Sequence, residues 1–309
     1  MIPSPETIKL HGSNPESVPP RRGFGDYQAD GFNWITPVGG EFYPDYLTSA
    51  TATFEGPIKR FGELIRQAGT SDQLLRLIGE EPNPPRVQLC RVFRKYVCPV
   101  VSVELLKQRK KVDSICRLWG HMFRPIDDVR RAWASRPDAD EALSAVLWEY
   151  NDRGQKGYDL AAAFFEYFRA HFDDHYSLEG PAGAGPDIKL DRVLKDYPHE
   201  RPVDFLVRRR SDSAVRVVGF ERYDSDRGGA QEDDRTGGYR TAVDEVLRYS
   251  DSKRLGLKVL FINDGPGLLL GSMWRDYAEI ENRHPGRVLV STLKMLPERL
   301  TRDWIEDSA

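Results

Sequence analysis

Apolar residues recur at helical spacing through the first half of the chain. Ile58, Phe61 and Leu64 lie on one helix face, and the spacing resumes at Leu74 after the capping residues 70–72. The helical pattern therefore predicts helices from residue 57 onward, interrupted by proline-rich residues 80–85. Further helices are expected over residues 104–119, 126–134, 139–150 and 158–172.

The second half of the chain changes to short apolar runs separated by turn residues. Residues 203–207 and 215–223 are rich in β-branched side chains and flank a polar turn, which predicts a β-hairpin. A helix near 240–252, a strand at 257–262, a helix near 268–282 and a strand at 287–293 should follow. Because strands that alternate with helices favour parallel crossovers, the expected class is α+β or α/β: a mostly helical N-terminal half, then a mixed five-stranded sheet flanked by helices.

Composition suggests three regions. Residues 1–56 are rich in Pro, Gly and aromatic side chains, which predicts an irregular arm. Residues 57–179 form the predicted helical region, and residues 180–309 the predicted α/β core. The stretch Gly180–Pro186, with the sequence G-P-A-G-A-G-P, is the expected linker between them.

Charge is unevenly distributed along a chain of 309 residues with a formal net charge of −3. Twelve lysines and arginines against four acids lie between residues 86 and 131, which indicates an anionic partner such as double-stranded DNA. Lysine and arginine contacts to phosphates supply most sequence-independent DNA affinity. The alternative is a solvated helical surface. The candidate phosphate contacts are Lys107, Arg109, Lys110 and Lys111.

The sequence disfavours several other classes of protein. No apolar run approaches the roughly 18 residues that a membrane helix needs, so no membrane association is expected. The three cysteines, Cys90, Cys98 and Cys116, show neither paired nor zinc-binding spacing. We therefore expect a globular protein of the reducing cytoplasm.

Two acids interrupt the predicted hairpin, one on each strand. Asp204 and Glu221 lie seventeen positions apart in apolar surroundings, where a carboxylate is costly to bury unless it is paired or holds a metal. Adjacent strands can present two carboxylates to one Mg²⁺ ion, with water completing its shell. The alternative pairs Asp204 with the arginines 208–210 and leaves Glu221 facing solvent. Asp224, at the end of the second strand, is a further candidate metal ligand whose alternative role is in a turn.

The segment from Arg227 to Arg240 is interpreted as a recognition loop. Arginine and glutamine side chains suit guanine edges, adenine edges and phosphates. The acids at 232–234 would repel DNA unless they cap a helix or pair with these arginines, so a surface ion-pair loop is the alternative. The candidate DNA-binding residues are Arg222, Arg227, Gln231, Arg235 and Arg240.

Residues 186 to about 293 resemble a type II restriction endonuclease of the PD-(D/E)XK nuclease superfamily. The family motif has an Asp, often after Pro, followed by Asp/Glu-x-Lys on the next strand. Pro202-Val203-Asp204 resembles the first element and Glu221 the second acid. The motif lysine is replaced by Tyr223, which leaves open whether Lys189, a nearby arginine or no cation takes its place.

The resemblance implies Mg²⁺-dependent, sequence-specific hydrolysis of double-stranded DNA. Asp204, Glu221 and Tyr223 would be catalytic, with Asp204, Glu221 and Asp224 as metal ligands. It also implies a homodimer matched to a palindromic site and a partner DNA methyltransferase in the host. The alternatives are an inactive DNA-binding protein with a degenerate nuclease core, and a protein whose basic helix serves a protein interface.

Overall fold

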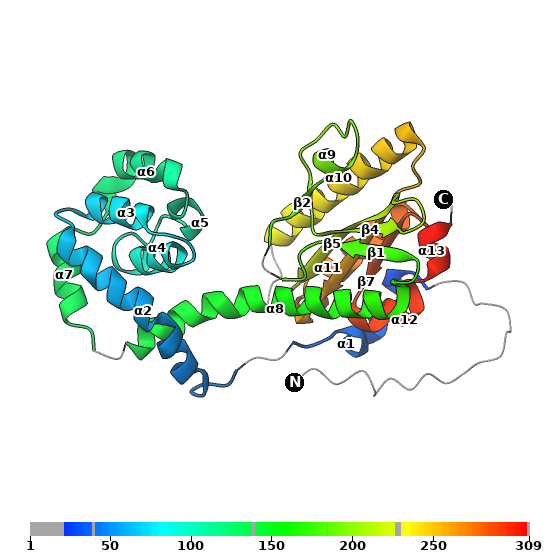
Figure 1. Cartoon of the computed structure of the whole chain (residues 1–309). Helices are drawn as coiled ribbons and strands as arrows, with labels where there is room; N and C mark the ends of the chain where they lie inside the picture. The colour runs from blue at the N-terminus through cyan, green and yellow to red at the C-terminus, as the bar shows by residue number, and fades with distance from the viewer. Residues whose placement is uncertain (1–21, 39–40, 138–139, 184, 226–229, 308–309) are drawn as a thin grey trace. The chain divides into compact units, whose positions relative to one another are not determined.

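The computed structural model describes residues 22–38, 41–137, 140–183, 185–225 and 230–307, and leaves out the side chains at 150–154 and 230–235. The chain divides into two compact units (Figure 1). Unit 1 consists of residues 1–39 and 153–309, and unit 2 consists of residues 40–152. None of the described helices is long and apolar enough to cross a membrane.

Unit 2 is helical, as the apolar spacing predicts. Thr70 caps the second helix by accepting a hydrogen bond from the Gln73 backbone N–H at 3.1 Å, which confirms the predicted cap. The expected helix over 104–119 is broken at Lys107 and Gln108, between two separate helices. The elements are α2 (Tyr46–Gln67), α3 (Ser71–Glu80), α4 (Pro85–Tyr96), α5 (Val103–Leu106), the 3-10 helices η3 (Arg109–Lys111) and η4 (Gly120–Met122), α6 (Val112–Trp119) and α7 (Ile126–Ala134).

A single helix, α8 (Glu141–Phe172), replaces the two helices expected at 139–150 and 158–172. Its first turns contribute Leu143 and Leu147 to the core of unit 2. Its last turns contribute Leu160, Phe164 and Phe168 to a core cluster of unit 1. The sequence between the two expected helices is polar, and a polar stretch is compatible with continuous helix.

Unit 1 is built on the mixed five-stranded sheet that the sequence predicts, in the order β1-β4-β5-β6-β7. The strands β4 (Phe205–Arg209) and β5 (Val215–Tyr223) form the expected antiparallel hairpin. β5 pairs in parallel with β6 (Lys258–Asp264), and β6 in parallel with β7 (Val288–Ser291). The edge strand β1 (Tyr176–Glu179) pairs antiparallel with β4 and lies in the segment expected to be helical. A separate ribbon joins β2 (Ile188–Lys189) to β3 (Pro202–Val203).

Helices cover both faces of this sheet. One core cluster packs α10 (Ala230–Lys253) and α11 (Met273–Arg283) against side chains of β5 and β6. The other packs the end of α8 and the C-terminal α12 (Leu296–Arg299) and α13 (Arg302–Glu306) against the opposite face (Figure 1). The sheet is therefore the middle layer of three. Short elements complete the unit: η2 (Phe24–Asp30), α1 (Gly31–Trp34), α9 (Leu190–Val193), η5 (Pro266–Leu269) and η6 (Leu293–Met295).

The boundaries of the regions differ from those expected. Residues 24–34 are helical and pack on unit 1, while α2 begins at Tyr46, so the interval 1–56 is not one irregular arm. Pro57, the predicted start of the helical region, lies inside α2. The stretch 180–186 joins β1 to β2 within unit 1 and is not the junction between units.

A buried ion pair fastens the N-terminal segment to the sheet. Arg299 is 1% exposed and donates to Glu281 at 2.5 Å. The Glu281 carboxylate also accepts the backbone N–H groups of Phe24 and Val290, each at 2.8 Å. One carboxylate thus joins η2, α11, β7 and α12. Its removal would leave the buried guanidinium charge of Arg299 without its acidic partner.

Glu281→Ala should therefore lower the free energy of unfolding by about 3–5 kcal/mol, as loss of one member of a buried pair does. Urea unfolding followed by circular dichroism measures the change. The control is Glu279→Ala on the same helix, because Glu279 pairs with Arg240 at the surface and should cost less than about 1 kcal/mol. Equal losses in the two variants would contradict a structural role for the buried pair.

Candidate functional site

Asp204 and Glu221 lie side by side where β4 and β5 pair. Phe205 is opposite Gly219, and the Asp204 backbone N–H donates to the Gly219 carbonyl at 3.0 Å. The Asp204 carboxylate in turn accepts the backbone N–H of Glu221 at 2.8 Å. The hairpin register itself therefore brings the two predicted acids together.

Burial and mutual repulsion make this acid pair electrostatically unusual. Burial, and secondarily the charge of Asp204, raise the pKa of Glu221 to about 8. Burial also raises the pKa of Asp204, although the N–H of Glu221 opposes this change. Glu221 Oε1 is buried and accepts no hydrogen bond from the described residues. An orphaned carboxylate oxygen beside a second acid is an arrangement that a divalent cation would stabilise.

A cavity of about 330 Å³ opens beside Asp204. Asp187 and Tyr239 line it, and the charge of Asp187 contributes to the raised pKa of Asp204. Sequence reasoning missed both residues, although the dipeptide Pro186-Asp187 offered a signal. Gly180 (φ +150°) borders the site, because a Cβ there would lie 2.5 Å from the Asp204 carbonyl oxygen.

Tyr223 lies at the end of β5, opposite Asp264 of β6. Its hydroxyl accepts the backbone N–H of Val38 at 2.9 Å, so only its own proton is available for donation. Burial raises the pKa of Tyr223, while the nearby positive charge of Lys156 on α8 lowers it. Lys189 instead pairs with Glu200 at the surface. The cation whose charge acts at the tyrosine therefore comes from a distant part of the sequence.

Asp224 and Arg222 bind each other. Asp224 is 3% exposed and accepts from Arg222 Nε at 2.6 Å. Its other carboxylate oxygen is buried and has no partner among the described residues. The backbone of Asp224 is held by Asp264 and Gly267, each through a hydrogen bond of 2.8 Å. Asp224 thus has a structural role at the strand end, and the guanidinium of Arg222 is engaged within the protein.

The predicted recognition loop is largely helical. Residues 230–253 form α10, so positions 232–234 lie in its first turns. Arg240 pairs with Glu279 at 3.0 Å and with Asp276 at 3.5 Å. Arg227 lies outside the described residues, as do the side chains of Gln231 and Arg235.

The basic cluster of unit 2 is only partly engaged. Lys107 pairs with Glu104, and Arg109 donates to the carbonyl of Glu81 at 2.6 Å. Lys110 and Lys111 are exposed on η3. These side chains belong to unit 2, whereas the acid pair belongs to unit 1.

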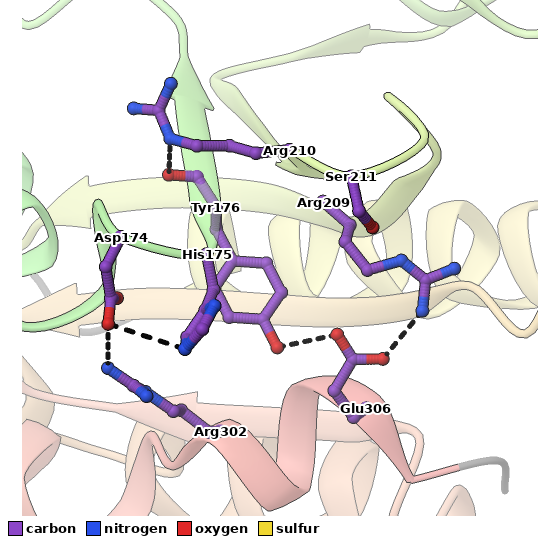
Figure 2. Close-up of a pocket in the computed structure, with 8 residues that line it drawn as sticks. All are labelled: Asp174, His175, Tyr176, Arg209, Arg210, Ser211, Arg302 and Glu306. Carbon is purple, nitrogen blue, oxygen red and sulfur yellow. Dashed lines mark hydrogen bonds and ion pairs between the residues drawn. The ribbon is translucent and has the colours of Figure 1, made fainter.

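A larger cavity of about 570 Å³ lies at the other end of β4, and its charges are neutralised internally (Figure 2). Arg209 pairs with Glu306 at 3.0 Å, and Arg302 with Asp174 at 2.6 Å. Arg210 pairs with Asp173, and Arg208 with Glu179, so each of the arginines 208–210 pairs with an acid other than Asp204. Asp204 and Arg209 are five positions apart along extended chain, roughly 17 Å.

No protein-family model matches the chain, and no curated protein matches it significantly. Within the described ranges, no group of three or more His, Cys, Asp or Glu side chains is placed to hold a metal ion. Asp204 and Glu221 therefore form a two-acid site. Mg²⁺ commonly uses only one or two protein carboxylates, with water and substrate phosphate supplying its other ligands.

The raised pKa of Glu221 predicts a specific pH dependence of stability. The folded chain binds this proton more tightly than the unfolded chain, so stability falls as pH rises from about 4.5 through about 8. Glu221→Gln imitates the protonated acid and should escape this loss. Its melting temperature should match the wild type near pH 4.5 and exceed it at pH 9 by several degrees, at about 2–4 °C per kcal/mol.

The control for this measurement is Glu200→Gln. Glu200 is exposed, and its pKa is lowered by the hydrogen bond to Lys189, so its removal should not stabilise the protein at pH 9. Scanning calorimetry at both pH values separates the variants. A Glu221→Gln difference that is the same at both pH values would show that Glu221 does not titrate as described.

Proposed function

We propose that the protein is a Mg²⁺-dependent, sequence-specific nuclease that hydrolyses double-stranded DNA, a type II restriction endonuclease of the PD-(D/E)XK kind. The observation that supports this proposal best is the buried pair of acids, Asp204 and Glu221, held together by the register of β4 and β5. Costly burial of two neighbouring carboxylates is typical of a site that receives a cation.

The order of elements around the acids also supports the proposal. β1 pairs antiparallel with β4, and β4 pairs antiparallel with β5. The chain then continues from β5 through α10 into β6, which pairs in parallel with β5. This layout resembles the nuclease core named above. Asp204 directly precedes β4, the second strand of that series, and Glu221 lies on β5, the third; the family motif likewise has its two acids on neighbouring strands.

Mg²⁺ fits the chemistry of these side chains. Asp204 and Glu221 would hold the ion, and Glu221 would release its proton on binding, because only the carboxylate is a ligand. A bound Mg²⁺ supplies Lewis acidity for phosphodiester hydrolysis and lowers the pKa of a coordinated water. Asp187, which lines the cavity beside Asp204, would add negative charge near the ion.

Two residues are proposed to work at the position of the motif lysine. Tyr223 would donate its hydroxyl proton to a phosphate oxygen or to the attacking water. Lys156 supplies positive charge near Tyr223 from α8, although it is not on the motif strand. The resemblance further implies a cytoplasmic homodimer on a palindromic site and a protecting DNA methyltransferase.

A second candidate function is DNA binding without cleavage. The observation that favours it is Tyr223 itself, whose hydroxyl is already bonded to the backbone of Val38 and whose ring replaces a charged side chain. A degenerate core of this kind would bind DNA in the presence or absence of a metal ion.

The test is incubation of the purified protein with phage and unmethylated plasmid DNA, with Mg²⁺ or with EDTA. We expect discrete bands with Mg²⁺ only. Glu221→Gln should cut at least about 100-fold more slowly while still binding DNA, since the ion supplies several kcal/mol of transition-state stabilisation. Glu279→Gln, an exposed acid on α11, should cut normally.

Each other outcome has a defined meaning. A salt-sensitive DNA complex without cleavage on several unrelated DNAs supports the inactive binder. Cleavage by Glu221→Gln at the wild-type rate rejects Glu221 as a ligand and directs attention to Asp224. Absence of both cleavage and binding counts against DNA as the partner.

A further inference from the structure

Unit 2 contains a groove that none of the predicted sites includes. A cavity of about 580 Å³ runs along α2 and is closed by the end of α7 and the start of α8. Its α2 side presents Glu55, Lys59, Gly62 and Arg66, whose spacing of four, three and four residues places them on one helix face. The groove therefore combines two cations of α2 with residues from a second wall.

Gly62 and Trp133 form the floor of this groove. A Cβ at position 62 would lie 2.8 Å from the Trp133 indole nitrogen, so only glycine lets the ring pack this closely. Trp133 also packs against Phe61, with ring centroids 5.2 Å apart. The guanidinium of Arg136 lies over the indole, 4.3 Å from the ring centroid. This stacking holds the guanidinium of Arg136 in the groove.

The groove also contains unsatisfied polar atoms. Ser144 is 1% exposed, and its hydroxyl forms no hydrogen bond within the described part of the chain. Arg136 Nε is likewise buried and without a partner there. Buried polar atoms are nearly always hydrogen-bonded, so two orphans in one cavity indicate a missing partner. Because Arg136 Nε can only donate, that partner must offer an acceptor.

Charge selects the class of ligand. Lys59 and Arg66 are exposed, and neither forms a salt bridge with another described residue; both act at longer range on Glu63. With Arg136 they give the groove three cations, against the acids Glu55 and Asp140. Asp140 accepts the Leu143 N–H at 2.9 Å and thereby caps α8. The polar groups that remain available to a ligand are therefore mainly the three cations and the hydroxyl of Ser144. Cationic and hydroxyl donors suit phosphate.

The length of the groove distinguishes a strand from a single phosphate. Lys59 and Arg66 are seven residues apart, a rise of about 10.5 Å along the helix. Two cations at this separation suit two separate phosphates of one chain better than one isolated anion. We propose that this groove on α2 binds the phosphate backbone of a DNA strand, with Lys59, Arg66 and Arg136 contacting phosphates and Ser144 donating a hydrogen bond.

Binding of DNA in this groove does not require cleavage. Its test therefore uses the full-length chain in EDTA, with a fluorescent 30-base-pair duplex and the matching single strand, and anisotropy as a function of salt. Lys59→Glu/Arg66→Glu should weaken duplex binding at least tenfold at 0.1 M salt. It should also reduce the slope of log affinity against log salt by about 2, since each phosphate contact contributes about 0.9.

Three matched variants make the result specific. Glu55→Gln removes an acid from the groove and should tighten binding. Ser144→Ala should weaken binding several-fold without lowering the melting temperature, since it removes an orphaned hydroxyl. Lys195→Glu/Lys253→Glu makes the same charge change at exposed positions of unit 1 and should leave affinity and slope unchanged.

Contrary results are equally defined. The proposal fails if the double variant in the groove binds like the wild type, or if the unit 1 control weakens binding equally. It also fails if AMP or inorganic phosphate binds through Lys59 and Arg66 while neither DNA form does. If the wild-type protein binds DNA through this groove but cleaves none, the proposed nuclease activity is rejected and the binding site is not.

Discussion

The register between β4 and β5 is the constraint on which the arrangement of unit 1 depends. β5 is the central strand: it pairs antiparallel with β4 and parallel with β6, and helices cover both of its faces. A slip of one residue would turn its core side chains to the opposite face. The same register sets the Glu221 backbone N–H against the Asp204 carboxylate. The β4–β5 register therefore both stabilises the sheet and positions the two acids.

The buried carboxylates of unit 1 differ in how their burial is offset. Asp264 accepts the backbone N–H groups of Thr36, Gly265 and Leu293, and Glu281 is bonded to Arg299 and two N–H groups. Glu221 has neither an ion partner nor a donor for its buried Oε1 among the described residues. Sites whose burial is left uncompensated in the folded protein are more often functional than structural.

Basic side chains likewise differ in whether an acid pairs with them. The arginines at the far end of β4 are paired with acids, which joins β1, β4 and α13 without leaving charge for a ligand (Figure 2). On α2, by contrast, Lys59 and Arg66 border a cavity that contains orphaned donors. The cluster Lys107–Lys111 combines the engaged side chains of Lys107 and Arg109 with the exposed Lys110 and Lys111, a difference that a linear count of basic residues does not show.

The sequence alone determined the hairpin, its two acids and the order of strands that follow, because β-branched runs and alternation are local signals. It also determined most helices of unit 2. Only the tertiary structure decided that β1 joins the sheet edge, that α8 is continuous, and that residues 24–38 pack on unit 1. It likewise brought Asp187 and Lys156 toward the site and Trp133 onto Gly62. These outcomes rest on contacts between residues far apart in the chain, and no local pattern of polarity encodes such contacts.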